Sequence, residues 1–108
     1  MNYKVTTILV FEKQAKRLIK KYPSLKKELA QLVDSLEQNP EQGDGLGNNF
    51  YKIRLAIASK NKGKSGGARV ITYLKIIENT VYLTSIYDKS EKETITKEEL
   101  LIIFNQIA

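Results

Sequence analysis

The spacing of the hydrophobic residues changes from a helical period to a strand period in the middle of the chain, and this change limits the possible folds more than any other feature. Over 11–22 and 25–36, apolar side chains recur every three to four residues, which is the period of an amphipathic helix. Over 50–58 and 68–77 they alternate with other side chains, which is the period of a strand. The sequence therefore predicts a pair of helices followed by a sheet.

The ends of the chain complete the predicted order of elements. β-branched and aromatic residues over 4–11 predict a short strand before the helices, and 80–87 predicts a third member of an antiparallel meander. A Thr-x-x-Glu capping box predicts a final helix over 97–106. We expect one α+β domain, residues 1–108, of order β-α-α-β-β-β-α, with a helical hairpin and a C-terminal helix packed on an antiparallel sheet.

Two glycine-rich segments look like nucleotide-binding motifs but do not meet their requirements. The G-D-G-L-G run within 41–49 follows a helix and precedes a strand, whereas a dinucleotide fingerprint needs the reverse order. The Gly-Lys-Ser at 63–65 lacks the earlier glycine of a Walker A motif, because position 58 is alanine. We therefore predict a flexible connection over 41–49 and a lysine-bearing hairpin loop over 59–67.

Basic residues are concentrated in one stretch. The chain has 18 Lys+Arg against 12 Asp+Glu, and between Gly45 and Ile77 it has seven basic residues and no acidic one. Such a stretch attracts polyanions, most often nucleic acid or anionic lipid, although a solubilising surface has the same composition. Lipid binding is the weaker interpretation, because the basic residues lie on strands and not on an amphipathic helix. Alternation places Lys52 and Arg54 on one face of the sheet.

The absence of histidine and cysteine narrows the possible chemistry. It excludes thiolate zinc sites, cysteine nucleophiles and imidazole bases, and a two-metal site would need carboxylates that the basic stretch lacks. We predict no metal and no cofactor. Clustered lysines and arginines can still cleave RNA by attack of a 2′-hydroxyl, because amines move protons and guanidinium groups bind phosphate.

The location of the protein is predicted from two absences. No apolar run approaches the roughly 20 residues that cross a bilayer. The N-terminal MNYKVTTILVF is too short and too strand-like for a secretory signal. We expect a soluble, cytoplasmic protein with no membrane partner.

Three segments covering nearly the whole chain carry a family resemblance: FEKQAKRLIKKYPSLKKELAQLVDSLEQNP, FYKIRLAIASKNKGKSGGARVITY and LTSIYDKSEKETITKEEL. They resemble the RelE/HigB-type toxins of bacterial type II toxin–antitoxin modules, and the HigB-like branch in particular. The resemblance implies a RelE-like microbial ribonuclease-type fold. It also implies a metal-independent mRNA interferase that inhibits translation by cleaving mRNA on the 70S ribosome. The implied partner is an antitoxin encoded by a neighbouring gene, and the free toxin is expected to be monomeric.

The resemblance also implies roles for individual residues. Lys52 and Arg54 correspond to the basic pair on the family's second strand, and Arg69 corresponds to an arginine at the start of the third. The implied roles are Lys52 as general base, Arg54 and Arg69 as transition-state stabilisers, and Lys89 or Lys92 as the acid that protonates the leaving oxygen.

Further residues are implied to contact RNA. Tyr73 or Tyr87 is expected to stack on an mRNA base, and the hairpin loop contributes Lys60, Lys62 and Lys64. The sequence departs from the RelE type in two places, since Arg54 replaces a lysine and the C-terminal helix has no tyrosine.

Two other functions are compatible with this scaffold. A ParE-like toxin would inhibit DNA gyrase and cleave nothing, but ParE-like members generally lack the basic constellation. A non-catalytic RNA- or ribosome-binding module would use the same basic surface and leave mRNA intact.

Overall fold

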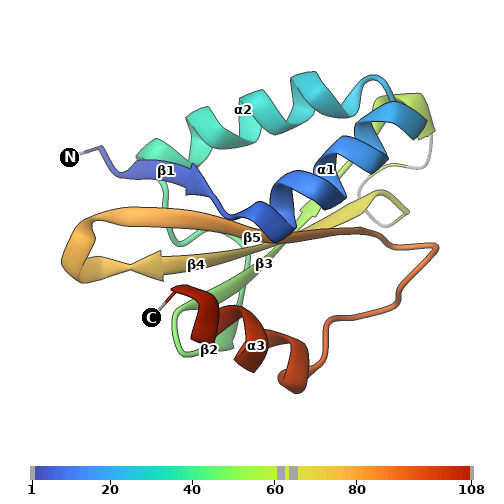
Figure 1. Ribbon diagram of the computed structural model, residues 1–108. Helices are drawn as coiled ribbons and strands as arrows, with labels where there is room; N and C mark the ends of the chain where they lie inside the picture. Colours follow the sequence, from blue (N-terminus) through green and yellow to red (C-terminus); the bar gives the residue numbers. More distant parts are fainter. Residues whose placement is uncertain (1, 61–62, 64–65, 108) are drawn as a thin grey trace.

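The two hydrophobic periods produce two kinds of layer, with helices on both sides of one sheet (Figure 1). The computed structural model describes residues 2–60, 63 and 66–107. Its strands are β1 (Lys4–Thr7), β2 (Asp44–Gly47), β3 (Phe50–Leu55), β4 (Ala68–Lys75) and β5 (Thr80–Asp88). Its helices are α1 (Leu9–Lys21), α2 (Leu25–Gln38) and α3 (Lys97–Ile107), with short 3₁₀ turns at Ala58–Lys60 and Ile76–Glu78.

The strands form one sheet in the order β1-β5-β4-β3-β2. β3, β4 and β5 make the predicted antiparallel meander, but β1 pairs with β5 in parallel, from Lys4 opposite Thr80 to Thr7 opposite Leu83. The predicted α+β fold with helices packed on a sheet is confirmed, but the sheet is mixed and not antiparallel, because β1 runs parallel to β5. Local sequence could not reveal this pairing, because the two strands lie at opposite ends of the chain.

The helical hairpin covers one face of the sheet, as its periodicity predicted. The apolar stripes of α1 and α2 are buried against the inward residues of the central strands, and α2 ends before Pro40. The first strand is shorter than predicted. It stops at Thr7, and Ile8 is the last extended residue before α1 begins at Leu9. The β-branched run favours a strand, but its last residues, from Leu9 to Phe11, form the first turn of the helix that buries Phe11.

The segment 41–49 is more ordered than predicted, because it contains β2. Gly47 lies opposite Phe50, so Asn48 and Asn49 form a two-residue hairpin turn between β2 and β3. Both asparagines have positive φ angles, 53° and 67°, which the right-handed twist of a tight hairpin requires and which asparagine tolerates. The prediction of a flexible connection was wrong for this part of the segment.

Two strands end earlier than predicted. β3 stops at Leu55, before the 3₁₀ turn Ala58–Lys60, and β4 stops at Lys75, before the turn Ile76–Glu78. Ile77 lies in the second of these turns and is exposed. Its β-branched side chain favours a strand by propensity alone.

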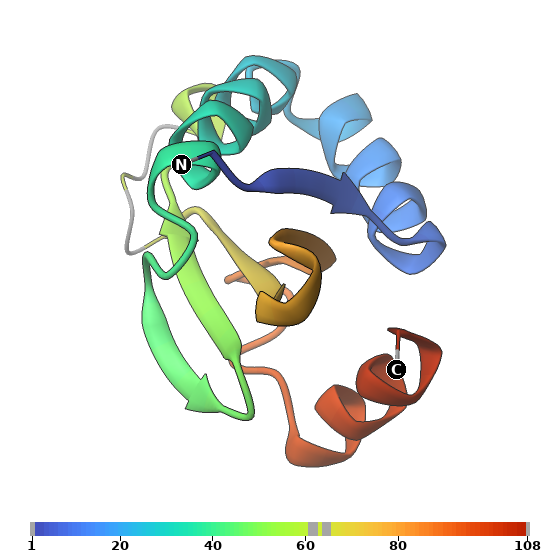
Figure 2. The same cartoon turned by 90° about the vertical axis from the view of Figure 1, so that its left-hand side faces the viewer.

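The C-terminal helix lies on the opposite face of the sheet from the hairpin, as Figures 1 and 2 show. The predicted capping box is confirmed: the Thr96 amide donates to Glu99 Oε1 at 2.9 Å, and the Glu99 amide donates to Thr96 Oγ1 at 3.1 Å. Ile103 of α3 is buried in a second, smaller apolar cluster, together with Phe50, Ile71, Tyr87 and Ile95. No helix in the described part of the chain has the length and apolar character to cross a membrane.

Candidate functional site

Two arginines and a tyrosine form a row across the sheet on the face that α3 covers (Figure 1). Arg54 of β3 lies opposite Arg69 of β4, which lies opposite Tyr87 of β5, so the three side chains project from the same face. Two like charges directly opposite each other destabilise a sheet by roughly 0.2–1 kcal/mol. A pair that breaks a local rule of strand pairing in this way is typical of a functional site.

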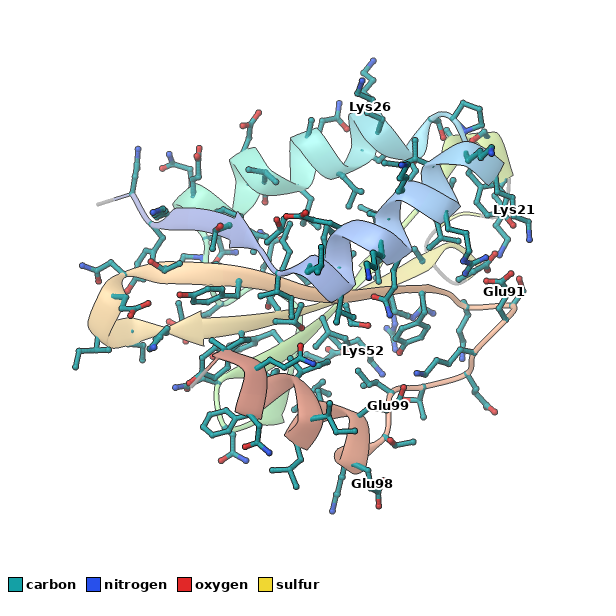
Figure 3. All side chains as sticks on the ribbon, in the orientation of Figure 1. Lys21, Lys26, Lys52, Glu91, Glu98 and Glu99 are labelled. Atoms are coloured by element: carbon teal, nitrogen blue, oxygen red, sulfur yellow. The ribbon has the colours of Figure 1, made fainter. Side chains whose placement is uncertain are left out.

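Lys52 extends this group along β3. It lies two residues before Arg54 and opposite Ile71, so it projects from the same face. Ile71 belongs to the second apolar cluster, which contains Ile103 of α3 and which we call the α3-side cluster. Figure 3 shows the half-buried Lys52 in the space between the sheet and α3. We call Lys52, Arg54, Arg69 and the Lys92 described below the basic face.

Arg69 is the most enclosed member of the basic face. Its residue exposure is 5%, whereas Arg54 is exposed to solvent. Its Nη1 donates to the carbonyl oxygen of Ala68 at 3.1 Å, which fixes part of the guanidinium against its own strand. A planar fork held in this way is suited to binding phosphate oxygens in one orientation.

Of the two candidate acids after β5, Lys92 reaches the basic face. Its Nζ lies 5.6 Å from the centroid of the Tyr87 ring and forms an ion pair with Glu99 of α3. Lys89 instead forms hydrogen bonds with backbone carbonyl groups. Its amide donates to the carbonyl of Gly67 at 3.0 Å, and its Nζ donates to the carbonyl of Glu93 at 3.0 Å.

Of the two tyrosines expected to stack on RNA bases, Tyr87 is buried and Tyr73 is half-buried. Tyr87 is 6% exposed within the α3-side cluster, and its hydroxyl has no hydrogen-bond partner among the described residues. Tyr73 packs with its ring centroid 5.0 Å from that of Phe50 and 5.8 Å from that of Phe104. It also lines a cavity of about 800 Å³ between α3 and the β2–β3 turn.

Lys60 does not join the basic face. Its Nζ forms an ion pair with Asp88 and donates to Ser90 Oγ at 3.1 Å, and its side chain is only 7% exposed. Asp88 lies opposite Ala68, so it projects toward the helical hairpin, where Tyr22 donates to it at 2.8 Å. Lys60 therefore lies on the opposite side of the sheet from the basic face. Lys62 and Lys64 lie outside the described residues.

Asp88 is charged despite its burial. Burial alone would raise the pKa of this carboxyl group, but hydrogen bonds from Lys60, Ser90 and Tyr22 outweigh that effect and hold the pKa well below its usual range. Ser90 donates twice to Oδ1, from its hydroxyl at 2.7 Å and from its amide at 2.9 Å. The ion pair is thus fully hydrogen-bonded, and it joins Lys60, which precedes β4, to Asp88 at the end of β5.

The two acidic residues that contact these lysines carry little sequence signal for that role. Asp88 is the last residue of β5, one position beyond the predicted strand 80–87, and Glu99 is predicted only as the carboxylate of the capping box. The spacing of Lys92 and Glu99 was a weak signal, because side chains seven residues apart meet only if the chain turns between them. Among the described residues, no three acidic, histidine or cysteine side chains come together in the way that a metal ion requires.

Comparisons with known proteins agree with this fold. Residues 8–108 match the family model of the RelE toxin of the RelE/RelB toxin–antitoxin system. A mutant of the E. coli toxin RelE in the free state is similar with a TM-score of 0.67 at 15% identity, over 100% of both chains. The isolated E. coli RelE toxin gives 0.51 at 19% identity, over 98% of this chain and 99% of that one.

A third structure, a metal-bound toxin from Helicobacter pylori, gives a TM-score of 0.53 at 22% identity, over 82% of this chain and 97% of that one. These identities are low, so the structural matches establish the fold. The family model covers almost the whole chain and establishes the family. The protein belongs to the RelE toxin family of RelE/RelB toxin–antitoxin systems.

Proposed function

We propose that this toxin is a ribosome-dependent mRNA endoribonuclease that inhibits translation without a metal ion. The observation that carries the proposal is the basic face, where four cationic side chains from β3, β4 and the segment after β5 gather on one side of the sheet. Membership of the family implies a cognate antitoxin as partner. We place the gene for that antitoxin beside the gene for this chain.

The proposed reaction is a transesterification within the mRNA. The 2′-oxygen attacks the neighbouring phosphorus, the bond from phosphorus to the 5′-oxygen breaks, and the products are a 2′,3′-cyclic phosphate and a 5′-hydroxyl. Lys52 takes the proton from the 2′-hydroxyl, and Arg54 and Arg69 stabilise the charge that develops on the phosphate oxygens. A protonated amine then supplies the proton for the leaving oxygen.

Lys92 is better placed than Lys89 to be that proton donor. Its Nζ lies above Tyr87, whose neighbour in the sheet is Arg69, so it is close to the phosphate-binding arginines. The Nζ of Lys89 instead donates to a backbone carbonyl within its own segment. We therefore assign the acid role to Lys92.

The proposed dependence on the ribosome is supported by the burial and packing of the two tyrosines. Tyr87 is buried, and Tyr73 is half-buried with its ring packed against Phe50 and Phe104, so neither tyrosine is a fully exposed stacking platform. Single-stranded RNA is normally held by such stacking platforms. We propose that the ribosome holds the mRNA in position and that the basic face supplies the charges for cleavage.

The test is to express the toxin from a tightly repressed promoter and to map the 5′ ends of cellular mRNA. We expect new 5′-hydroxyl ends within translated regions, and we expect Lys52→Gln and Arg54→Gln to lower the cleavage rate by at least about 100-fold. Lys26→Gln is the matched control, because Lys26 is an exposed lysine on α2 that points away from the sheet (Figure 3). It should retain full activity.

Two results would contradict the proposal. Growth arrest with intact transcripts would point to inhibition of gyrase or to ribosome binding without cleavage. Equal activity of the wild type and the Lys52→Gln and Arg54→Gln variants would place the reaction elsewhere on the molecule. Copurification of the protein encoded by the adjacent gene would test the antitoxin separately.

A further inference from the structure

The carboxylate of Glu99 brings a negative charge into the basic face. Glu99 lies in the first turn of α3, and its two oxygens have different partners. Oε1 accepts the Thr96 amide at 2.9 Å as part of the capping box, and Oε2 forms the ion pair with Lys92. One side chain therefore fixes the start of α3 and also neutralises a cation that RNA cleavage would need.

The ion pair is accessible to a competing anion. The side chains of Lys92 and Glu99 are 34% and 38% exposed, so solvent and dissolved ions reach both. Pairs with this exposure contribute little to stability, because water screens the attraction. A chain of phosphates, which carries several charges close together, can therefore displace one carboxylate from Lys92.

Glu99 keeps favourable contacts after it loses Lys92. Its Oε1 still accepts the Thr96 amide, and its charge lies at the N-terminal end of a helix, where the backbone dipole favours anions. Hydrogen bonding to Lys92 is the main reason that the pKa of Glu99 lies below its ordinary value, with the capping contacts acting in the same direction. The capping contacts with Thr96 stay in place when Lys92 leaves, so they continue to favour the charged form of the carboxylate.

Lys92 also covers the Tyr87 ring while Glu99 holds it. The Nζ of Lys92 lies 5.6 Å from the centroid of that ring, and the Tyr87 hydroxyl is buried without a hydrogen-bond partner among the described residues. Movement of Lys92 toward an incoming phosphate would take its charge away from this ring, while Tyr87 itself stays enclosed by the apolar residues packed around it.

We propose that Glu99 is an internal competitor of RNA, which occupies Lys92 in the free toxin and is displaced by the phosphate backbone when RNA binds. This inference rests on the proposed function, because it takes the basic face as the RNA-binding surface. Glu99 is a regulating residue in this scheme and takes no part in the chemical steps.

The test compares two substitutions that remove the same charge. Glu99→Gln removes the competitor but keeps the cap, because a glutamine carbonyl can accept the Thr96 amide. Glu98→Gln is the control, since Glu98 precedes Glu99 in α3, is exposed and points away from the sheet (Figure 3). Affinity for a fluorescent single-stranded RNA oligonucleotide is measured at low salt. We expect Glu99→Gln to bind about two- to five-fold more tightly than Glu98→Gln, as befits a partly exposed pair.

A third variant shows whether the effect passes through Lys92. In a Lys92→Met background, Glu99→Gln should no longer change the affinity, because the lysine that it releases is gone. Equal affinity of the Glu99→Gln and Glu98→Gln proteins would overturn the proposal, and so would an undiminished gain in the Lys92→Met background. Thermal melting of each variant confirms that it is folded.

The binding assay separates this inference from the proposed function. RNA binding that is strengthened by Glu99→Gln, together with intact mRNA in the cell, would support the competitor and refute the nuclease. Cleavage of mRNA by a toxin whose RNA affinity does not respond to Glu99→Gln would support the nuclease and refute the competitor. Absence of oligonucleotide binding by both proteins would also refute the competitor.

Discussion

At the scale of single residues, the most deeply buried ion pair among the described residues is that of Lys60 and Asp88. Asp88 is fully buried and the Lys60 side chain is 7% exposed, so neither charge is well hydrated. The cost of removing them from water is offset by four hydrogen-bond donors around the carboxylate: the Lys60 ammonium, the amide and hydroxyl of Ser90, and the Tyr22 hydroxyl. Such a pair holds its two segments in one arrangement, and removing one partner lowers the free energy of unfolding strongly because the other charge stays buried.

We predict that Asp88→Asn destabilises the protein by roughly 3–5 kcal/mol, because it leaves the Lys60 ammonium buried without its counter-charge. Denaturation in urea at neutral pH measures the change. Asp34→Asn, on the exposed side of α2, is the control and should change stability by less than about 0.5 kcal/mol. A similar small effect of both substitutions would show that the pair contributes little.

The same carboxylate predicts how stability depends on pH. The folded-state pKa of Asp88 is lowered, so its contribution to stability is present above the unfolded pKa of about 3.9 and is lost as the pH falls below that value toward the folded pKa. In the wild type we expect a steep loss of stability in this acidic range. Asp88→Asn should flatten the curve there, as measured by thermal melting between neutral pH and pH 2. An unchanged slope would contradict the assignment.

At the scale of elements, the β2–β3 hairpin positions the strand that carries Lys52 and Arg54. Gly43, just before β2, has a φ angle of +100°, and a side chain added there would lie 2.6 Å from the Lys52 carbonyl oxygen. The close approach of these backbones requires glycine at this position. The placement of Lys52 thus depends on a residue nine positions earlier in the sequence.

We predict that Gly43→Ala destabilises the fold by about 1–3 kcal/mol and lowers mRNA cleavage, because β3 must shift to accommodate the new methyl group. Gly45→Ala is the matched control, since its added carbon would meet only the Tyr51 ring at 4.0 Å. Urea denaturation and 5′-end mapping measure the two effects. Equal behaviour of the two alanine variants would show that the strand tolerates the change.

At the scale of the whole molecule, the two faces of the sheet are covered unequally. The apolar cluster beneath α1 and α2 is extensive, whereas α3 has only Ile103 buried among its described side chains and leaves Leu101 and Ile102 about 60% exposed. Burial of apolar surface is the main source of local stability. The helix that carries Glu99 is therefore held less firmly than the opposite layer.

We predict that the amides of α3 exchange with deuterium well before those of β4 and β5 in the native protein. The central strands should exchange only on global unfolding, because both of their faces are covered. Mass spectrometry of peptides after timed exchange measures both. Protection of α3 equal to that of β4 would contradict this difference.

Much of the fold could be predicted from the local pattern of residues. The stripes of Leu and Ile fixed the helical hairpin, alternation placed Lys52 and Arg54 on one face, and Thr96 with Glu99 marked the start of α3. These features depend on neighbours within about four residues, so periodicity and capping rules are sufficient. The RelE family was also indicated by the sequence, while its HigB-like branch and the roles of the site residues stay predictions.

Only the tertiary structure decided which distant residues meet. It paired β1 with β5 in parallel, turned Lys60 inward to Asp88 and set Glu99 against Lys92. It also packed Tyr87 beneath that lysine and removed its ring from the surface. The physical reason is that the sequence specifies which side chains are apolar, charged or turn-forming, whereas contacts between separate elements depend on how their layers pack.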